Sequence, residues 1–354
     1  MSRLILYAGR RFGRFAVLLF VAPVALIFYL WLTLLDTNPV WFFGTAIVML
    51  PLTTLATAFL VATLAAGFRR RKIKGVDKAA APGLWSAWES IAGPRRAAKT
   101  VIVIDDQCNA GVGRERVFGP VGSRIILTVG IPLLATADQK TIVAVLAHEN
   151  AHVVNKDTNG SLNLAEFGKT FDFVYEYASP KRTISGRLLF AAMGWLAKSL
   201  EKEQARLSRE AEIAADRHAA ASGNAAETAQ AFLLFAAAGA FVGEVDKALQ
   251  LELLGAMSPP QPPLQRLLEA AQRLSDRTLL NAYARKALEQ TADEVSSHPS
   301  WAQRLLALGF AEPPEIEPIA TTALSTMLSE NTATQIVHDF DRAWTRRVVN
   351  ALQR

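Results

Sequence analysis

The chain has 354 residues, 51% of them hydrophobic, and a formal net charge of +6. This length suits one large domain with a membrane segment or two modest domains, and the apolar excess near the N-terminus argues against an ordinary soluble enzyme. Because the arginines cluster at the ends of apolar stretches, we interpret them as membrane-flanking charges and expect no nucleic-acid partner. The single cysteine, Cys108, excludes an intrachain disulfide and fits a reducing compartment.

Residues 1–74 have the pattern of a membrane hairpin. Residues 15–35 are almost continuously apolar, a polar turn follows at 36–39, and residues 40–68 form a second apolar run with Pro51 as a predicted kink. A cleaved signal peptide is the alternative, but the first run is too long for one and leads directly into the second. Four arginines precede the first run and five basic residues follow the second, so the positive-inside rule places residues 75–354 in the cytoplasm.

Two β-branched segments follow, at 100–106 (TVIVIDD) and 124–129 (RIILTV), and both predict strands. Between them lies Cys108-Asn109-Ala110-Gly111-Val112-Gly113. Small residues such as Asn109, Ala110 and Gly111 would let a peptide backbone approach a sheet edge, where zinc peptidases commonly bind substrate as an added strand. An ordinary Gly-containing connection is the alternative.

Residues 136–155 predict a helix that carries His148-Glu149-Asn150-Ala151-His152. Thr136 and Gln139 have the spacing of a capping box at its start. On a helix His148 and His152 are one turn apart, so both imidazoles can reach one metal ion, and Glu149 then lies beside that metal. A carboxylate in this position can take a proton from a metal-activated water. The pattern therefore predicts zinc peptidase chemistry, with chance occurrence on a buried or solvated helix as the alternative.

A catalytic zinc ion requires a third protein ligand. The next long polar helix, expected at about 199–222 and ending at Gly223, offers Glu201, Glu203, Glu210, Glu212 and Asp216. Glu212 and Asp216 share a face, so one can bind zinc while the other hydrogen-bonds a liganding imidazole, whereas Glu210 and His218 lie off that face. Asp157 has two interpretations. Its carboxylate could orient a metal ligand or the end of the helix, or it could be an ordinary solvated side chain. The apolar run 188–197 is too short for another span and suits a buried or membrane-surface helix.

These segments resemble a known family. SREAEIAAD at 208–216, together with HENAHVVNKD at 148–157 and ILTVGIPLLATADQKTIVAVLA upstream, is similar to the HtpX-type membrane zinc metallopeptidases, to which the CAAX prenyl proteases also belong. The resemblance implies that His148, His152 and Glu212 bind Zn²⁺, that Glu149 is the catalytic base, and that Asp216 supports the ligands. It also implies that the segment starting at Asn109 is a substrate-binding edge strand, although the aromatic residue often found there is missing.

The C-terminal part is expected to be helical. Residues 229–242 predict a core helix, the proline-rich segment 258–263 a break, and the residues up to 295 two amphipathic helices. Ser297-His298-Pro299 with Arg304 resembles a family segment whose side chains are thought to approach the oxyanion; without the resemblance, His298 would be a turn residue. Residues 316–354 form a predicted helical tail of unassigned role.

Together these observations predict a mainly α fold with a small β-sheet: a gluzincin-type zinc metallopeptidase domain at 75–315 behind a two-helix transmembrane hairpin at 1–74. The expected activity is membrane-anchored, zinc-dependent endopeptidase action on membrane or misfolded proteins at a bacterial inner membrane. A CAAX-type processing protease is one alternative, but that type encloses its site in a chamber of seven spans and only two are evident here. A non-catalytic zinc-stabilised scaffold is the other, and the intact Glu149 argues against it.

Overall fold

The computed structural model describes residues 2–65, 73–118, 121–177, 184–222, 224–291, 296 and 298–353. The chain forms two compact units. The first comprises Met1–Lys72, Arg114–Ser123 and Lys156–Leu207, and the second Ile73–Gly113, Arg124–Asn155 and Ser208–Arg354. The basic residues 69–72 and the expected C-cap Gly223 lie outside the described residues.

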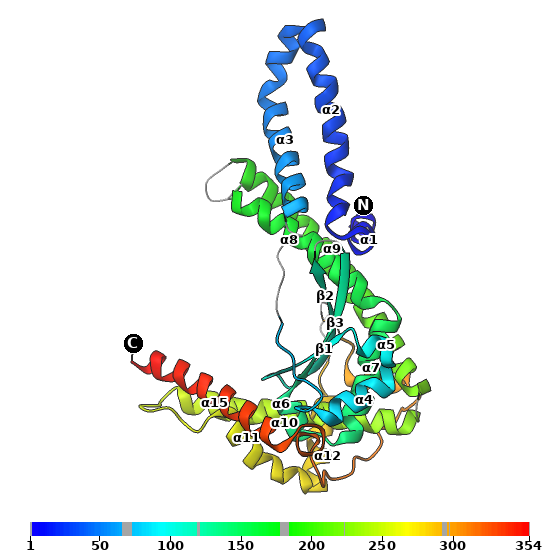
Figure 1. Cartoon of the computed structure of the whole chain (residues 1–354), viewed down its shortest axis with the longest axis vertical. Coiled ribbons are helices and arrows are strands. Elements are labelled where there is room, and N and C mark those ends of the chain that lie inside the picture. Colours follow the sequence, from blue (N-terminus) through cyan, green and yellow to red (C-terminus); the bar gives the residue numbers. More distant parts are fainter. Residues whose placement is uncertain are drawn as a thin grey trace. The chain divides into compact units, whose positions relative to one another are not determined.

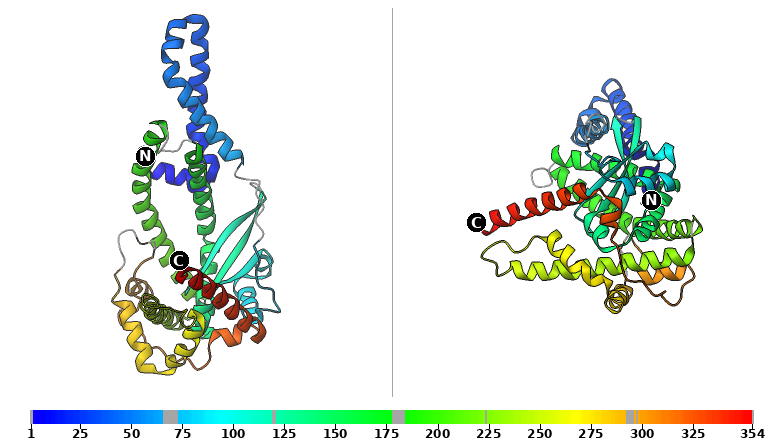
Figure 2. Two further views of the ribbon diagram at one scale, coloured as in Figure 1. Left: turned by 90° about the vertical axis from the view of Figure 1, so that its left-hand side faces the viewer. Right: turned by 60° about the horizontal axis from the view of Figure 1, so that its bottom comes forward.

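The first unit holds the N-terminal helices. These are α1 (Ser2–Phe12), the 3₁₀ turn η1 (Gly13–Val17), α2 (Leu18–Thr37), α3 (Pro39–Ala65) and α8 (Asp157–Tyr177). Helices α2 and α3 lie side by side as a hairpin in both Figure 1 and Figure 2. Trp31 joins them: its ring stacks on Phe42 with centroids 4.2 Å apart, and its indole N–H donates to Thr45 Oγ1 at 3.0 Å.

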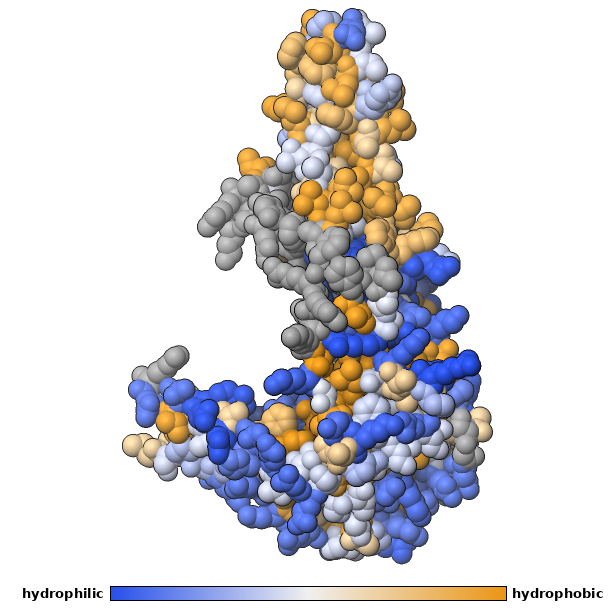
Figure 3. Space-filling view, in the orientation of Figure 1, coloured by the Kyte–Doolittle hydropathy of each residue, from blue (hydrophilic) through white to orange (hydrophobic). Residues whose placement is uncertain are grey.

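The hairpin has the dimensions and surface of a membrane anchor. The 20 residues of α2 span about 30 Å, the thickness of a hydrocarbon core. Figure 3 shows apolar side chains over the face of α2 and α3 that it displays. Within the described residues, α3 and α10 (Ala225–Leu253) are each long and apolar enough to cross a membrane. The segments Arg3–Val17 and Val21–Thr37 are bent relative to each other, and together they would form a third such span if counted as one. The most apolar part of α10 is 61% buried in the protein, against 6% for α3, so α10 is a core helix.

The chain forms a three-stranded sheet with the order β1-β3-β2, made of β1 (Thr100–Asp105), β2 (Ala110–Phe118) and β3 (Val121–Gly130). β1 pairs with β3 in parallel, with Thr100 opposite Ile125. The two strands predicted from the sequence are present, and the Gly-containing segment between them is a third strand at the sheet edge. The division between the two units falls within both β2 and β3.

The second unit also contains most of the helices that follow the hairpin. They are α4 (Pro82–Ala92), α5 (Pro94–Ala97), α6 (Ile131–Thr136), α7 (Gln139–Val154), the C-terminal end of α9 (Ile184–Ser222), α10, α11 (Pro263–Ala271), η2 (Gln272–Ser275), α12 (Arg277–Leu288), α13 (Trp301–Ala307), α14 (Ala323–Met327) and α15 (Glu330–Leu352). The core includes Trp88 of α4, Leu127 of β3 and Leu146 of α7, all fully buried. Ala323 and Met327, from the expected C-terminal tail, belong to the same core.

The sequence misplaced two helix boundaries. Thr136 does not cap the helix that carries the histidines; it ends α6, and its hydroxyl donates to the carbonyl of Pro132 at 2.6 Å. Asp138 is the true cap, because its carboxylate accepts the backbone N–H of Thr141 at 2.8 Å. Similarly, α9 begins at Ile184 rather than near Ser199, so the apolar run 188–197 is part of one 39-residue helix.

Candidate metal centre

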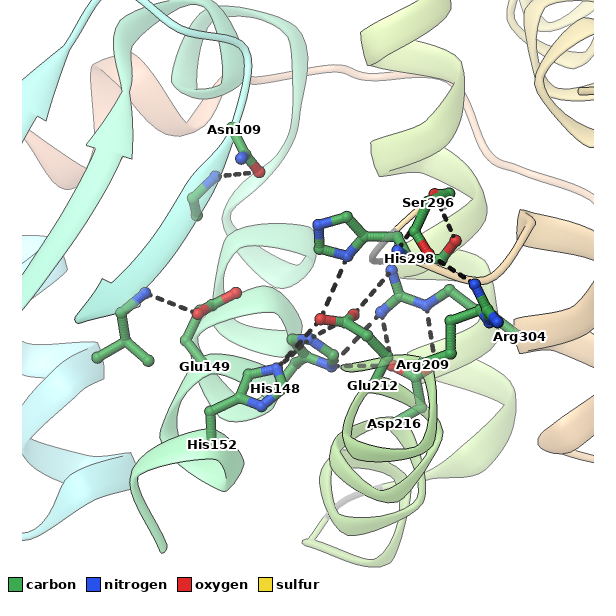
Figure 4. Close-up of polar contacts among 12 residues, drawn as sticks. Asn109, His148, Glu149, His152, Arg209, Glu212, Asp216, Ser296, His298 and Arg304 are labelled. Carbon is green, nitrogen blue, oxygen red and sulfur yellow. Dashed lines mark hydrogen bonds and ion pairs between the residues drawn. The ribbon is translucent and has the colours of Figure 1, made fainter. Parts of the chain in front are cut away.

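Two helices of the second unit supply the central side chains. On α7, Ile142, Val145 and Leu146 are buried in the core, while the turns that follow bring His148 and His152 toward α9. On α9, Glu212 and Asp216 lie one turn apart and are both buried, whereas Glu210 is exposed. Figure 4 shows the imidazoles and the two carboxylates meeting between the helices.

His148, His152 and Glu212 offer three potential ligand atoms to one point. The Nε2 atoms of the two imidazoles are 3.2 Å apart. The Glu212 carboxylate oxygens lie 3.4 Å from His148 Nε2 and 3.5 Å from His152 Nε2. Ligands bound tetrahedrally to Zn²⁺ at about 2.0–2.1 Å lie about 3.3–3.4 Å from one another, so these separations fit a zinc ion with a fourth position left for another ligand.

Glu149 lies next to these ligands and contacts the sheet. One carboxylate oxygen, Oε2, accepts the backbone N–H of Val112 at 2.8 Å. Val112 belongs to β2, which is an edge strand, and a Cβ added to Gly111 or Gly113 on either side would meet open space. Glu149, the predicted base, therefore hydrogen-bonds β2, the strand that contains the predicted substrate-binding segment.

Behind the ligands, a buried chain of polar contacts leads from His148 to α13. His148 Nδ1 is 2.8 Å from Asp216 Oδ1. Arg304 forms a two-point ion pair with Asp216, with Nε 2.8 Å from Oδ2 and Nη2 2.6 Å from Oδ1. A carboxylate bonded to the far nitrogen of a liganding imidazole fixes the tautomer and orientation of the ring.

Two aromatic rings hold the Arg304 guanidinium in place. Its carbon lies 4.9 Å from the ring centre of Phe232 on α10 and 4.5 Å from that of Trp301 on its own helix. Phe232 also meets the His148 ring edge to face, with centroids 5.7 Å apart. Since the Arg304 side chain is only 7% exposed and its guanidinium lies near both rings, packing as well as charge restricts its position.

His298 reaches the ligand group from the loop that precedes α13. Its Nδ1 is 3.2 Å from Glu212 Oε1, yet the side chain is 65% exposed. Arg209 fixes the same loop by donating to the carbonyl of Ser296 at 2.8 Å. His298 thus lies at the open side of the site, whereas Arg304 lies at its enclosed side.

The match to a protein family agrees with this geometry. Residues 89–310, well over half of the chain, match Peptidase family M48. The chain belongs to peptidase family M48. A solved structure, the crystal structure of S. mikatae Ste24p, is similar at 17% sequence identity with a TM-score of 0.32. That likeness covers 82% of this chain and 63% of the Ste24p chain, so this protein spans less than two thirds of the length of that relative. No curated protein matches.

M48 membership indicates a metallopeptidase, and the electrostatics of the site suit a cation. Burial alone would raise the pKa of the Glu212 carboxyl, but the hydrogen bonds from His148, His152 and His298 lower this pKa far below its usual range. Burial also opposes ionisation of Asp216, and its contacts with Arg304 and His148 likewise lower its pKa. Both carboxylates are therefore negative at neutral pH. Glu149 differs, because burial raises its pKa above the usual range despite the nearby imidazoles.

The remaining predicted residues of this M48 chain lie at the starts of two elements, β2 and α8. Asn109 directly precedes β2 and bonds the backbone N–H of Ala110 through its side chain, and Ala110 and Gly111 open that strand. Asp157 begins α8 in the first unit, where an acidic side chain suits a helix N-terminus.

Sequence reasoning missed Val112, Phe232 and Trp301 as parts of the site, although Val112 lies inside the segment it named. The role of Gly130 was also missed. A Cβ there would lie 1.5 Å from the carbonyl oxygen of Gln107, so only glycine fits at the end of β3, where it packs against the backbone of Gln107.

Proposed function

We propose that this M48 protein is a membrane-anchored, zinc-dependent endopeptidase that cleaves misfolded or membrane polypeptides at the cytoplasmic face of a bacterial inner membrane. One observation carries the proposal. Two imidazole nitrogens and a carboxylate lie at the spacing of tetrahedral zinc ligands, and Glu149 lies beside them. A purely structural zinc ion has no use for a base in that position.

Each residue has a distinct task in the reaction. His148, His152 and Glu212 would hold Zn²⁺, which supplies Lewis acidity for a peptide carbonyl and for water. Glu149 takes the proton of the attacking water and later gives a proton to the leaving amine. His298, exposed at the open side of the site, donates a hydrogen bond to the oxygen of the carbonyl as negative charge develops there.

The substrate is expected to bind as an extended strand along β2. This strand is a sheet edge, and the space beside Gly111 and Gly113 leaves room for an added backbone. Because Val112 N–H bonds Glu149, a chain paired with this edge lies next to the base. Backbone pairing is insensitive to side chains, so this mode of binding supports broad action on unfolded polypeptides rather than on one short motif.

Arg304 acts through its neighbours. Its guanidinium pairs with Asp216 at two points and lies near Phe232 and Trp301, and its Nη1 is 3.8 Å from Glu212 Oε2. We therefore assign it a positioning role for His148 and Glu212 rather than contact with the oxyanion. Through Asp216 it keeps the imidazole oriented toward the metal.

Full-length protein reconstituted in nanodiscs tests the function. With unfolded casein as substrate we expect cleavage that stops with 1,10-phenanthroline and returns when Zn²⁺ is restored. A farnesylated peptide with a C-terminal CAAX sequence serves as the second substrate. Cleavage of that peptide without cleavage of casein would favour the processing protease, and zinc-loaded protein inactive on unfolded and membrane polypeptides would favour the scaffold.

A further inference from the structure

The unit that contains the hairpin holds a buried cation with no counter-ion among its described residues. Arg14 of η1 is only 4% exposed, and its Nε has no hydrogen-bond partner. The guanidinium carbon lies 5.6 Å from the centre of the neighbouring Phe15 ring. A buried charge is costly unless an opposite charge or strong acceptor accompanies it, and among the described residues Arg14 has no such partner.

The corner around Arg14 is built by specific contacts with α8. Gly13 has a positive φ of 59°, and a Cβ there would lie 3.3 Å from Glu166 Oε2 and 3.4 Å from the Asn163 backbone. Asn163 Nδ2 donates to the carbonyl of Arg10 at 2.9 Å, which fixes the end of α1. The neighbouring acid, Glu166, is ion-paired with Arg116 at 3.1 Å. The fold thus fixes the backbone at Arg14 while the nearby carboxylate pairs with a different arginine.

The surroundings are those of a lipid headgroup region. Helix α1 buries Leu6 and Ala8 in its own unit but exposes Leu4, Tyr7 and Phe12, and it carries arginines in its last turn. Exposed apolar side chains beside basic ones are typical of a helix that lies in the membrane interface. The apolar helix α2 begins at Leu18, shortly after Arg14, so this guanidinium lies at the level where a crossing helix meets the headgroups.

We propose that Arg14 binds the phosphate of an anionic phospholipid at the corner between α1 and η1. The planar guanidinium can donate two parallel hydrogen bonds to a phosphate, and the lipid would supply the missing counter-ion. Arg10 and Arg11 add positive charge near the same corner, which favours a lipid with net negative charge over a zwitterionic one. The acyl chains would lie against exposed apolar side chains of α1 and α2. This site stands apart from the proposed peptidase function.

Native mass spectrometry of the full-length protein in detergent tests the proposal, with phosphatidylglycerol as the probe. We expect Arg14→Gln to bind it about tenfold or more weakly than wild type, as loss of a charge-assisted hydrogen bond implies. Arg11→Gln removes the same charge from an exposed position and should change binding much less. Equal affinities for wild type and Arg14→Gln, or equal losses in both variants, would overturn the proposal.

Thermal unfolding of wild type provides a second test that needs no variant. We expect phosphatidylglycerol to raise the melting temperature more than a diacylglycerol with the same acyl chains, because only the former carries a phosphate. Phosphatidylcholine should stabilise less than phosphatidylglycerol, and inorganic phosphate alone should have little effect. Equal stabilisation by diacylglycerol would exclude a phosphate site, and full stabilisation by inorganic phosphate would show a free-anion site instead of a lipid site.

Discussion

Arg304 and Asp216 are joined by two hydrogen bonds of 2.8 and 2.6 Å, and the Asp216 oxygen in the shorter bond is also 2.8 Å from Nδ1 of His148. Arg304 and Asp216 are 88 positions apart in the sequence and meet in a fully buried contact. This buried ion pair therefore connects α13 to the imidazole of His148 on α7.

Replacement of Arg304 by lysine should weaken zinc binding and activity together. Lysine keeps the charge but cannot form the two-point contact, and loss of a partner that orients a metal ligand typically costs about 10–100-fold in metal affinity or activity. Zinc affinity can be measured by competition with a chelator, alongside kcat and KM on casein. Wild-type zinc affinity with a reduced kcat would instead indicate that Arg304 acts on the reacting substrate.

Glu212 should be essential for metal binding, while Glu210 should not. Both are acidic residues of α9, but Glu212 is buried against the two histidines and Glu210 is exposed. We expect about one zinc per chain in wild type and in Glu210→Ala, and almost none in Glu212→Ala. Elemental analysis of protein purified without chelators measures this. The same zinc content in both variants would remove Glu212 from the ligand set.

The pairing of His148 with His152 on α7 and of Glu212 with Asp216 on α9 was predictable from the sequence, because helical spacing alone puts each pair on one face. Spacing did not select Glu212 among the acids of α9; the family resemblance did. The contact between Val112 and Glu149 was not predictable, since it depends on how an edge strand rich in glycine and charge packs against a helix 37 positions away. The cap at Asp138 was missed because Thr136 and Gln139 mimic a capping box, and α1 was missed because its charges interrupt the apolar pattern.

Cys108 should react slowly with thiol reagents in the folded protein. Burial raises the pKa of its thiol from 9.0 to about 12. Only the thiolate reacts, and a rise of three units lowers its fraction at pH 8 by roughly a thousandfold. We therefore expect alkylation by iodoacetamide at pH 8 to be at least about a hundredfold slower in the native protein than in denaturant. Similar rates in both states would show that the thiol is accessible.

The hairpin should place the peptidase domain in the cytoplasm. Arginines precede the first span and basic residues follow the second, whereas the opposite end of the hairpin carries a single charge, Asp36 in the last turn of α2. Reporter fusions after Asn38 should therefore show external placement, and fusions after Ala80 cytoplasmic placement. The opposite pattern would move the site to the other side of the membrane and change which polypeptides it meets.

The zinc content and turnover of Glu149→Gln test the central claim most directly. Glutamine preserves the size of the side chain, and the metal ligands are untouched, but the base is lost. We predict about one zinc per chain, as in wild type, with casein cleavage reduced by about 10²–10⁴-fold. Turnover near the wild-type rate in the zinc-loaded variant would contradict the account, because Glu149 would then not be the base.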